Sequence, residues 1–519
     1  MIKASRFVQG GFAVLFGLSI LSVIARGYVK YPSVGITAIL ILGTLFTFGM
    51  IKLYDYLRRK TIRLSQKKIN KIFMLIALGV FILQILSVFA LKFEPVSDLS
   101  YVNGAAKNFC QSWNKTDLPH DLPLIHINYF ARYPNNHALL IVLSLVYSAC
   151  NHIFGSMPLI VPMILNAIGL NISYIFMYLI AGKIFKDKFT PLFCAIIGAG
   201  FSVFYTYTPF FYTDPMSMPF SMGSIYFFLA ALDSPKLRTK ILQLSASSLL
   251  LIAGYKMKGN VIILIPVYIL YLIVTCNKER IKNYCKVLCI LLAGLIASSA
   301  ACTAFIDSFD IASQAEAEVA QFPPEHWIMM GLHDRGGFYL DDFWLTNSHP
   351  TYETKKEANI AEIKKRISDY GFTGLVKHFA KKISWTWGDG TYFIGYYMKR
   401  SIENSKTDMN IFRYIVSKSG AFKIYCSVYQ FLLLFMILFS FIDGAVSKKQ
   451  GCELILKIII CGVYFFFAIW ETRSRYLVNF TPVFIITAVY SVKTLSAIIK
   501  RSSLSYGRIN LDRKLKKAG

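Results

Sequence analysis

Apolar residues occur along the chain in runs of about twenty, separated by short polar segments. We place membrane spans at residues 8–26, 34–57, 72–92, 159–181, 189–208, 217–232, 241–255, 261–276, 287–306, 421–442, 454–470 and 477–497. A run of about 20 apolar residues is long enough to cross a bilayer as a helix. Since irregular chain cannot satisfy its backbone hydrogen bonds in lipid, the pattern predicts an all-α polytopic membrane protein with about 12 transmembrane helices.

One apolar stretch is predicted not to cross. Residues 138–150 read ALLIVLSLVYSAC, which at about 13 residues is short for a span. If this stretch crossed, the basic segment 183–188 (KIFKDK) would lie outside and every later loop would invert. We therefore expect an interfacial or re-entrant helix within one long outer loop, residues 93–158.

Composition supports the membrane class. The chain is 55% hydrophobic and only 16% charged, which is too little charge for the surface of a soluble protein of this length. Its net charge of +28 is concentrated in alternate short loops, as the positive-inside rule expects of cytoplasmic loops, so we do not assign it to nucleic-acid binding. The pattern predicts a multi-pass protein of the cell membrane with both termini in the cytoplasm. The ten cysteines form no CxxC pair or metal spacing, which indicates neither a disulfide framework nor a zinc site.

Charge and hydropathy divide the chain into five regions. These are two N-terminal helices with a basic loop (1–71), a transmembrane core (72–306), a large outer region (307–420), C-terminal helices (421–499) and a basic tail (500–519). The outer region holds 15 of the 28 acidic residues, as a solvated folded region would. Within it, apolar residues at helical spacing over 359–387, divided by Gly371, predict two amphipathic pieces that rest against the membrane.

Four short motifs carry the candidate chemistry, and the predicted topology places all of them at the outer face. They are Glu94 and Asp98 in KFEPVSDLSY, Asp214 in YTDP, Lys256 and Lys258 in YKMKGN, and Glu471, Arg473, Arg475 and Tyr476 in ETRSRY. Each motif alone has an ordinary structural explanation. An aspartate before proline caps helices and forms turns, interfacial lysines extend toward water, and Glu471 with Arg473 could be a structural ion pair.

Together the motifs suit one reaction. A pair of carboxylates provides a general base and a stabiliser or metal ligand. Lysine and arginine on the side where positive charge is scarce can hold a phosphate leaving group at headgroup level. The combination indicates transfer of a group from a phosphate-bearing lipid to an acceptor outside the membrane.

The order of these motifs resembles the GT-C superfamily of membrane glycosyltransferases, and most closely its protein-mannosyltransferase and aminoarabinose-transferase branch (glycosyltransferase family 39). The first outer loop begins with an acidic motif, and YFARYPNNH (129–137) is similar to the branch's His-Pro-Pro helix region. Asp214, Lys258-Gly259 and Arg475-Tyr476 match the later motifs. The sequence departs from the branch at Asn135-Asn136, where many relatives have prolines, and at Leu99, where an adjacent acid would stand.

The resemblance implies a role for each matched residue. Asp98 would be the general base of an inverting displacement, Asp214 would organise the site, and Lys256 or Lys258 with Arg473 and Arg475 would bind the lipid phosphate. Supporting candidates are Glu94, Tyr133, Asn135, Asn136, His137, Glu471 and Tyr476, with Asp341, Asp342 and Trp387 as weaker ones in the large outer loop.

The resemblance also implies the substrates. The donor would be a polyprenyl-phosphate monosaccharide, and the acceptor a cell-wall or surface polysaccharide, a teichoic acid, a glycolipid or a protein. Some branches use Mg²⁺ or Mn²⁺, and the sequence shows no complete ligand set. Functional partners would be the enzyme that charges the lipid and the flippase that delivers it.

Two other functions fit the composition. A polymerase that joins lipid-linked repeat units also has about a dozen spans, a large outer loop and outer arginines. A lipid or polysaccharide transporter would instead place charges and helix breaks within its spans. The predicted spans hold almost no charge away from their ends, which favours chemistry at the interface.

Overall fold

The computed structural model describes residues 2–25, 36–114, 128–404, 411–447 and 451–518. Every regular element within these ranges is a helix, as the apolar pattern predicts. The first region contains α1 (Ile2–Ala25) and α2 (Ile36–Thr61), and α3 (Gln66–Leu91) opens the core. The first outer loop contains α4 (Asp98–Ser112), α5 (Tyr129–Arg132), η3 (Pro134–Asn136) and α6 (His137–Phe154).

The remaining core helices are α7 (Ile160–Ile184), α8 (Phe189–Ala199), α9 (Val203–Thr206), α10 (Thr213–Met216), α11 (Met218–Asp233), α12 (Leu237–Met257), η4 (Gly259–Ile263), α13 (Leu264–Thr275) and α14 (Ile281–Asp307). The large outer region contains α15 (Gln314–Ala320), α16 (Pro324–Gly331), α17 (Leu340–Asn347), α18 (Tyr352–Trp387), α19 (Ile394–Asn404) and α20 (Ile411–Lys418). The chain ends with α21 (Gly420–Val446), α22 (Leu454–Ile469), η5 (Ser474–Phe480) and α23 (Thr481–Ala518).

Within the described residues, each predicted span overlaps one or more of these helices. By length and composition, nine helices of the described residues are candidate spans, and three shorter apolar helices, Phe189–Ala199, Gly259–Thr275 and Leu454–Ile469, accompany them. The apolar stripe that α3 presents outward is typical of a lipid-facing surface: Met74, Leu78 and Phe89 are 54 to 61% exposed at helical spacing,. The protein is therefore an all-α polytopic membrane protein.

One predicted span, 189–208, is wrong as a single helix. α8 ends at Ala199, and a short α9 begins at Val203. The carbonyl groups freed at the break are satisfied by tyrosines, since Tyr425 donates to the carbonyl of Gly200 and Tyr429 to that of Ile197. A broken helix is tolerated at membrane depth when protein groups replace the lost backbone hydrogen bonds.

α3 and α7 pack antiparallel along their length. Asn171 of α7 donates to the carbonyl of Ala77 at 3.2 Å, Tyr178 donates to Asn70 at 3.0 Å, and Lys188 reaches the carbonyl of Leu64 at 2.5 Å. The end of α7 therefore lies beside the start of α3. The segment that connects the two helices, residues 92–159, leaves α3 and enters α7 at the other end of this helix pair. α6 is long enough to be a candidate span, but this pairing supports the prediction that it remains at one face.

We expect a topology reporter fused after Lys186 to report the cytoplasmic side. The segment that follows α7 shares its end of the bundle with the basic loop after α2, through the contact between Lys188 and Leu64. A reporter cleaved or labelled from outside would mean that α6 crosses the bilayer. The matched control is a fusion after Lys60, which the same topology places inside.

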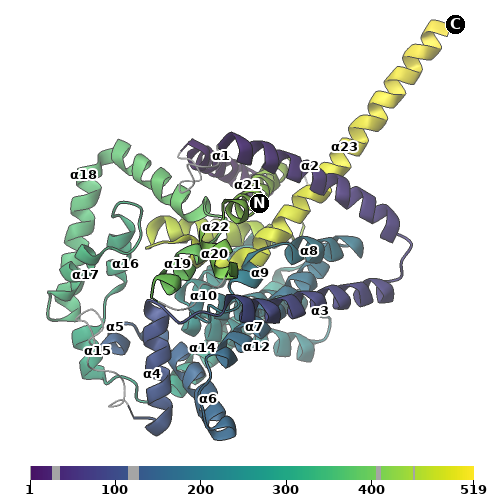
Figure 1. Ribbon diagram of the computed structural model, residues 1–519. Helices are drawn as coiled ribbons and strands as arrows, with labels where there is room; N and C mark the ends of the chain where they lie inside the picture. Colours follow the sequence, from purple (N-terminus) through teal and green to yellow (C-terminus); the bar gives the residue numbers. More distant parts are fainter. Residues whose placement is uncertain (1, 26–35, 115–127, 405–410, 448–450, 519) are drawn as a thin grey trace.

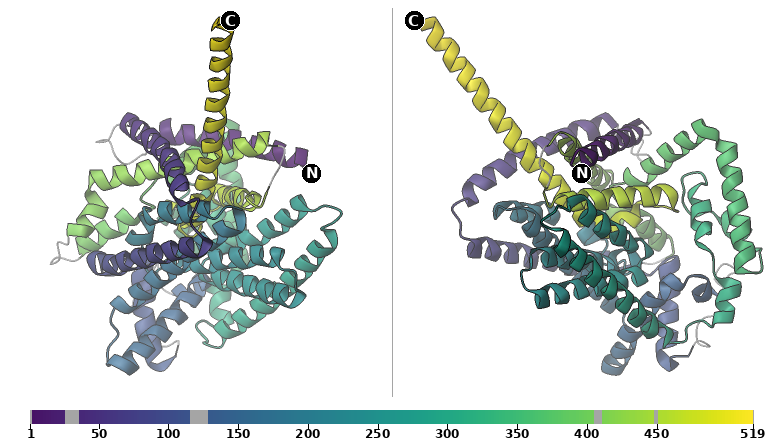
Figure 2. Two further views of the ribbon diagram at one scale, coloured as in Figure 1. Left: turned by 90° about the vertical axis from the view of Figure 1, so that its right-hand side faces the viewer. Right: turned by 180° about the vertical axis from the view of Figure 1, so that it is seen from behind.

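The large outer region lies on one side of the bundle. In Figures 1 and 2, α15 to α18 form an arc along one side, while the C-terminal end of α23 projects from the opposite side. α18 bends at Gly371, whose φ of 54° and ψ of −174° are not helical, so the predicted division at this glycine is confirmed. Arg132 of α5 joins the two outer loops, because its guanidinium donates to Asn347 of α17 at 3.0 Å and lies over the Phe343 ring.

Candidate functional site

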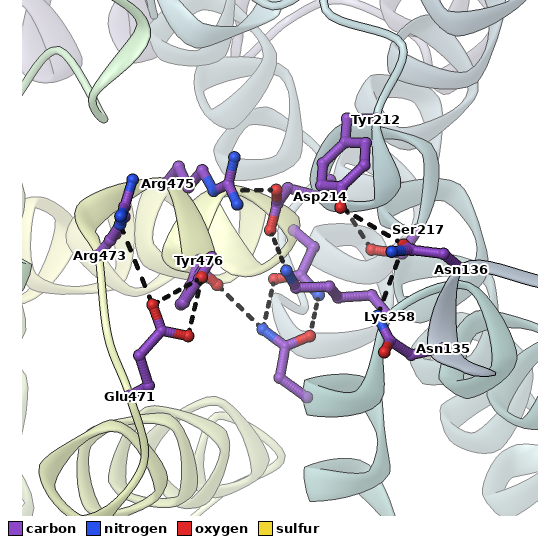
Figure 3. Close-up of polar contacts among 12 residues, drawn as sticks. Asn135, Asn136, Tyr212, Asp214, Ser217, Lys258, Glu471, Arg473, Arg475 and Tyr476 are labelled. Carbon is purple, nitrogen blue, oxygen red and sulfur yellow. Dashed lines mark hydrogen bonds and ion pairs between the residues drawn. The ribbon is translucent and has the colours of Figure 1, made fainter. Parts of the chain in front are cut away.

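The centre of the candidate site is the carboxylate of Asp214, which is only 1% exposed. Lys258 Nζ lies 2.7 Å from its Oδ1, and Arg475 Nε lies 3.6 Å from its Oδ2 (Figure 3). α10 supplies Asp214, the residue after α12 supplies Lys258, and η5 supplies Arg475. Three of the four sequence motifs therefore meet, although they are far apart along the chain.

Tyrosine rings surround the two cations. The guanidinium of Arg475 lies 5.2 to 5.4 Å from the ring centres of Tyr212, Tyr397 and Tyr476, and it donates to the hydroxyl of Tyr397. Lys258 Nζ lies 4.2 Å from the centre of the Tyr476 ring. Cation–π contacts of this kind are strongest where water is excluded. Burial lowers the pKa of Lys258 from its ordinary value, and the nearby charge of Asp214 opposes that shift.

A second carboxylate completes the cluster. Tyr476 donates to both oxygens of Glu471 at 3.1 Å, and Arg473 Nε lies 4.0 Å from Glu471 Oε1. Among the described residues, Lys258, Arg473 and Arg475 form ion pairs with two carboxylates, those of Asp214 and Glu471. These five side chains together carry one excess positive charge. A buried cluster with an uncompensated cation is suited to binding an anion.

Asparagines that the sequence reasoning missed fix η5 against η4. Asn260 donates to the carbonyl of Tyr476 at 3.0 Å, and Asn479 donates to the amide oxygen of Asn260 at 2.8 Å. Ser221 of α11 donates to the carbonyl of Asn479 at 3.1 Å. These contacts position Arg475, and their only sequence signal is that both asparagines follow charged motifs within a few residues.

Asp98 lies at the first position of α4, where it is partly exposed. No hydrogen bond or ion pair joins its carboxylate to another residue that the structure describes. Its position is shown by its neighbours: burial raises the pKa of Tyr129 and of Tyr212, and the negative charge of Asp98 adds to both shifts. Asp98 therefore lies near Tyr129 and Tyr212, and the Tyr212 ring adjoins Arg475.

The Asn135–His137 stretch supports this tyrosine group. Asn136 donates to the Tyr129 hydroxyl at 2.8 Å and accepts from the Tyr212 hydroxyl at 3.4 Å. His137 Nε2 donates to the carbonyl of Phe130 at 2.8 Å, which fixes the α6 start. The predicted neighbours Tyr133 and Asn135 lie at the same place: the Tyr133 ring packs 5.0 Å from that of Tyr129, and Asn135 is exposed.

The structure does not bring every candidate into the cluster. Lys256 points toward α14, where its Nζ donates to Thr303 at 2.8 Å. Glu94 and Asp341 are exposed. Asp342 is bound by Arg366 at 2.6 Å within the outer region, and Trp387 packs in the core against Phe16 and Phe484.

The residues at the centre do not fit a divalent metal. The two oxygens of Asp214 face Lys258 and Arg475, whose charges would repel a further cation. Within the described ranges, no group of three or more His, Cys, Asp and Glu residues is arranged to hold a metal ion.

The outer region is attached to the cluster through the backbone before η5. The backbone N–H of Glu471 donates to the carbonyl oxygen of Trp327 at 2.8 Å, and the backbone N–H of Thr472 donates to the carbonyl oxygen of Gly336 at 2.6 Å. Lys382 of α18 lies beneath this joint, fully buried, with its Nζ 2.7 Å from the carbonyl oxygen of Gly331. Burial lowers the pKa of Lys382 from 10.5 to about 7, and the charge of Glu471 partly opposes the shift.

We expect the stability of the protein to rise with pH between about 7 and 10 because of Lys382. In this window the unfolded chain holds a proton that the folded chain has released, so the free energy of unfolding increases by at most about 1.4 kcal/mol per pH unit. Melting curves at pH 7 and 9 should show a larger increase for the wild type than for Lys382→Met. Lys364→Met, an exposed position on the same helix, should behave as the wild type; equal slopes for all three proteins would contradict the assignment.

These features define an all-helical, polytopic integral membrane protein with a buried charged cluster at one end of its helices. The chain belongs to the family described as "Conserved hypothetical integral membrane protein", whose match covers residues 4–496. Comparison with curated proteins finds no match.

Among solved structures, the protein is similar to the Archaeoglobus fulgidus oligosaccharyltransferase tethered with an acceptor peptide containing the NVT sequon. The TM-score is 0.40 and the identity 15%, over 83% of this chain and 50% of that one. The chain thus spans about half the length of the archaeal protein.

Proposed function

We propose that the protein is a GT-C-like membrane glycosyltransferase that moves a sugar from a polyprenyl-phosphate monosaccharide to an acceptor outside the cell membrane. The observation that carries the proposal is the arrangement of Lys258, Arg473 and Arg475 against two carboxylates. The carboxylate of Asp98 lies near the same tyrosines and pairs with no other residue that the structure describes. A cation cluster and a separate base are the two parts that transfer from a lipid phosphate requires.

The donor phosphate fits the charge of the cluster. A phosphodiester carries one negative charge, which equals the excess positive charge of the five side chains of the cluster. The cluster lies at the end of α12 and at the start of α23, as a phosphate at headgroup level would require. Arginines held against rings keep their in-plane N–H groups directed for paired hydrogen bonds to phosphate oxygens.

The different surroundings of the two aspartates support different roles for them. Asp214 lies between two cations, and its two oxygens face Lys258 and Arg475, so its role is to hold the two cations in place. Asp98 is unpaired and partly exposed, so it can take the proton of an acceptor hydroxyl. That oxygen then forms a bond to the anomeric carbon while the bond to the phosphate oxygen breaks, and the phosphate leaves with the electron pair. Lys258, Arg473 and Arg475 stabilise the charge on the leaving phosphate, and a single displacement inverts the anomeric centre.

Arg473→Gln should weaken donor use without unfolding the protein. Arg473 is 22% exposed and lies 4.0 Å from Glu471, so its loss leaves no tightly paired charge behind. A lost charge-assisted hydrogen bond to phosphate corresponds to about a tenfold increase in KM for the donor. Steady-state kinetics with the donor lipid in nanodiscs measure this, with Lys364→Gln as the control. An unchanged KM would remove Arg473 from the phosphate site.

Surface glycans test the proposed reaction in the cell. A strain that lacks the gene, complemented with wild type or Asp98→Asn, is compared by composition analysis and mass spectrometry. Loss of one sugar residue that only the wild type restores is the expected result, and it would also identify the sugar. Loss of long polymer chains instead would indicate a polymerase of lipid-linked repeat units. A transporter would be indicated if the deletion strain accumulates the donor lipid while membrane fractions that lack this protein still transfer the sugar in vitro.

A further inference from the structure

A strip of arginines and aromatic rings runs over the outer region toward the candidate site. We define the arginine–aromatic strip as Arg335, Trp385, Phe393, Arg473, Tyr396 and Arg400. Each member contacts at least one other: the guanidinium of Arg335 lies 4.9 Å from the Trp385 ring centre, and that ring centre lies 6.1 Å from that of Phe393. Arg473 lies 5.3 Å from the Phe393 ring, and Tyr396 stacks on the same ring at 4.9 Å.

The strip ends beside the proposed base. Arg400 Nη1 donates to the Tyr396 hydroxyl at 3.1 Å and to Ser97 Oγ at 3.2 Å, and Ser97 immediately precedes Asp98. One end of the strip is therefore at the outer region, its middle member Arg473 belongs to the charged cluster, and its other end adjoins Asp98. Arg335 and Tyr396 are 43% and 41% exposed, so the strip is accessible from outside.

The chain builds the middle of the strip at a conformational cost. Tyr392 and Phe393 have φ values of 53° and 69°, a region that costs non-glycine residues on the order of 1–3 kcal/mol each. Asp389 holds this backbone in place, since it accepts hydrogen bonds from Thr391 N at 3.0 Å and from Phe393 N at 2.9 Å. It also accepts from Ser474 at 2.8 Å, between the two arginines of η5. Strain of this kind persists where function requires it.

We propose that the arginine–aromatic strip binds the acceptor, and that the acceptor is a polyanionic glycan with phosphate or carboxylate groups on successive units. An arginine that lies flat on a ring keeps its N–H edges free for an anion, and several in a row match a repeating charge. Asp334, which lies 3.4 Å from Arg335 and also pairs with Lys381, leaves one excess positive charge at the outer end. The word acceptor rests on the proposed function; the binding of the polyanion does not.

Lipid headgroups are the competing occupant, because arginine and aromatic residues also gather at membrane interfaces. The strip differs from such a belt in its direction. It crosses the loop after α16, the end of α18 and the start of α19, and it finishes between Arg473 and Asp98 rather than on the apolar stripes of the spans. This direction favours a water-soluble glycan chain, which the strip would guide toward Asp98.

Direct binding tests the inference without any transfer assay. The full-length protein, in nanodiscs of phosphatidylcholine, is titrated with poly(glycerol phosphate), with polygalacturonate and with neutral dextran. Arg335→Gln and Arg400→Gln should each weaken binding of at least one polyanion about tenfold, and their combination should weaken it further. Dextran should not bind, and Lys364→Gln should bind as the wild type.

Several results of the same titrations would contradict the inference. Unchanged polyanion binding in the double variant, or equal binding of dextran, would overturn the inference. Binding of soluble dihexanoyl phosphatidylglycerol that depends on both arginines, in the absence of polyanion binding, would assign the strip to lipid. If a glutamine variant has a lowered melting temperature, Arg335→Lys and Arg400→Lys replace it in the titration. Lysine keeps the positive charge and loses only the paired N–H donors of the guanidinium. Polyanion binding with no sugar transfer would refute the proposed function alone, and transfer with no polyanion binding would refute this inference alone.

Discussion

Asp214→Ala lowers the thermal stability of the protein and abolishes its activity: this is the larger of the two effects that we expect. The substitution leaves Lys258 and Arg475 without the carboxylate that both face at 2.7 and 3.6 Å. Removal of one partner from a buried ion pair costs about 3–5 kcal/mol, because the remaining charge is buried without compensation. Here one carboxylate serves two cations, so the loss should lie at the upper end of that range.

Melting curves in detergent measure the effect, and Asp233→Ala is the matched control. Asp233 pairs with Lys183 at 3.1 Å, but its side chain is 58% exposed, and surface pairs contribute at most about 1 kcal/mol. Adding Lys258→Met to Asp214→Ala should restore part of the lost stability, since one uncompensated cation is removed. A melting temperature for Asp214→Ala equal to that of the control would show that the cluster is hydrated and loosely held.

The spans were predictable because hydropathy and length set them directly. The break between α8 and α9 was not, because it depends on tyrosines of α21, more than two hundred positions away, that replace the lost backbone partners. Loop charge predicted that residues 138–150 do not cross the membrane, because a crossing there would invert every later loop. The antiparallel contacts of α3 and α7 agree with that prediction. What the apolar pattern missed was the length of α6, which begins one residue earlier, at His137, and continues four residues further, to Phe154, for 18 residues in all.

The site shows the same division between local signal and tertiary contact. Lys256 and Lys258 look alike in the sequence, but α12 ends at Met257, so Lys256 remains on the helix and points to Thr303. Lys258 leaves the helix and reaches Asp214. A shift of two positions at a helix end redirects a side chain. Sequence patterns do not locate a helix end to within a single residue.

Residues that hold the site were harder to predict than residues that form it. Tyr397 and Asp389 lie in the outer region with no charged motif beside them, and they become visible only through their contacts with Arg475 and Ser474. Asp389 lies between two glycines (388–390, GDG), which indicates a turn but not its partner. The charged motifs are local and visible in the sequence, whereas the residues that support them are recognised only through the fold.

Asp98→Asn should abolish transfer and leave the fold intact. The carboxylate has no hydrogen bond or ion pair with any described residue, so its neutralisation removes no structural contact and the melting temperature should stay within the error of the measurement. Loss of a general base lowers the rate by about 10² to 10⁴. Single-turnover transfer from the donor lipid in nanodiscs measures the chemical step separately from binding.

Glu94→Gln is the matched comparison, because Glu94 stands four positions earlier in the same KFEPVSDLSY stretch and is exposed. Its substitution should leave the single-turnover rate near that of the wild type. The reverse result, with Glu94→Gln inactive and Asp98→Asn active, would transfer the base to Glu94 and require α4 to turn during the reaction. Equal and normal rates for both variants would mean that neither carboxylate of this stretch takes the proton, and that the charged cluster binds its anion without chemistry. The pair of variants therefore separates an enzyme from a binding protein with the same fold.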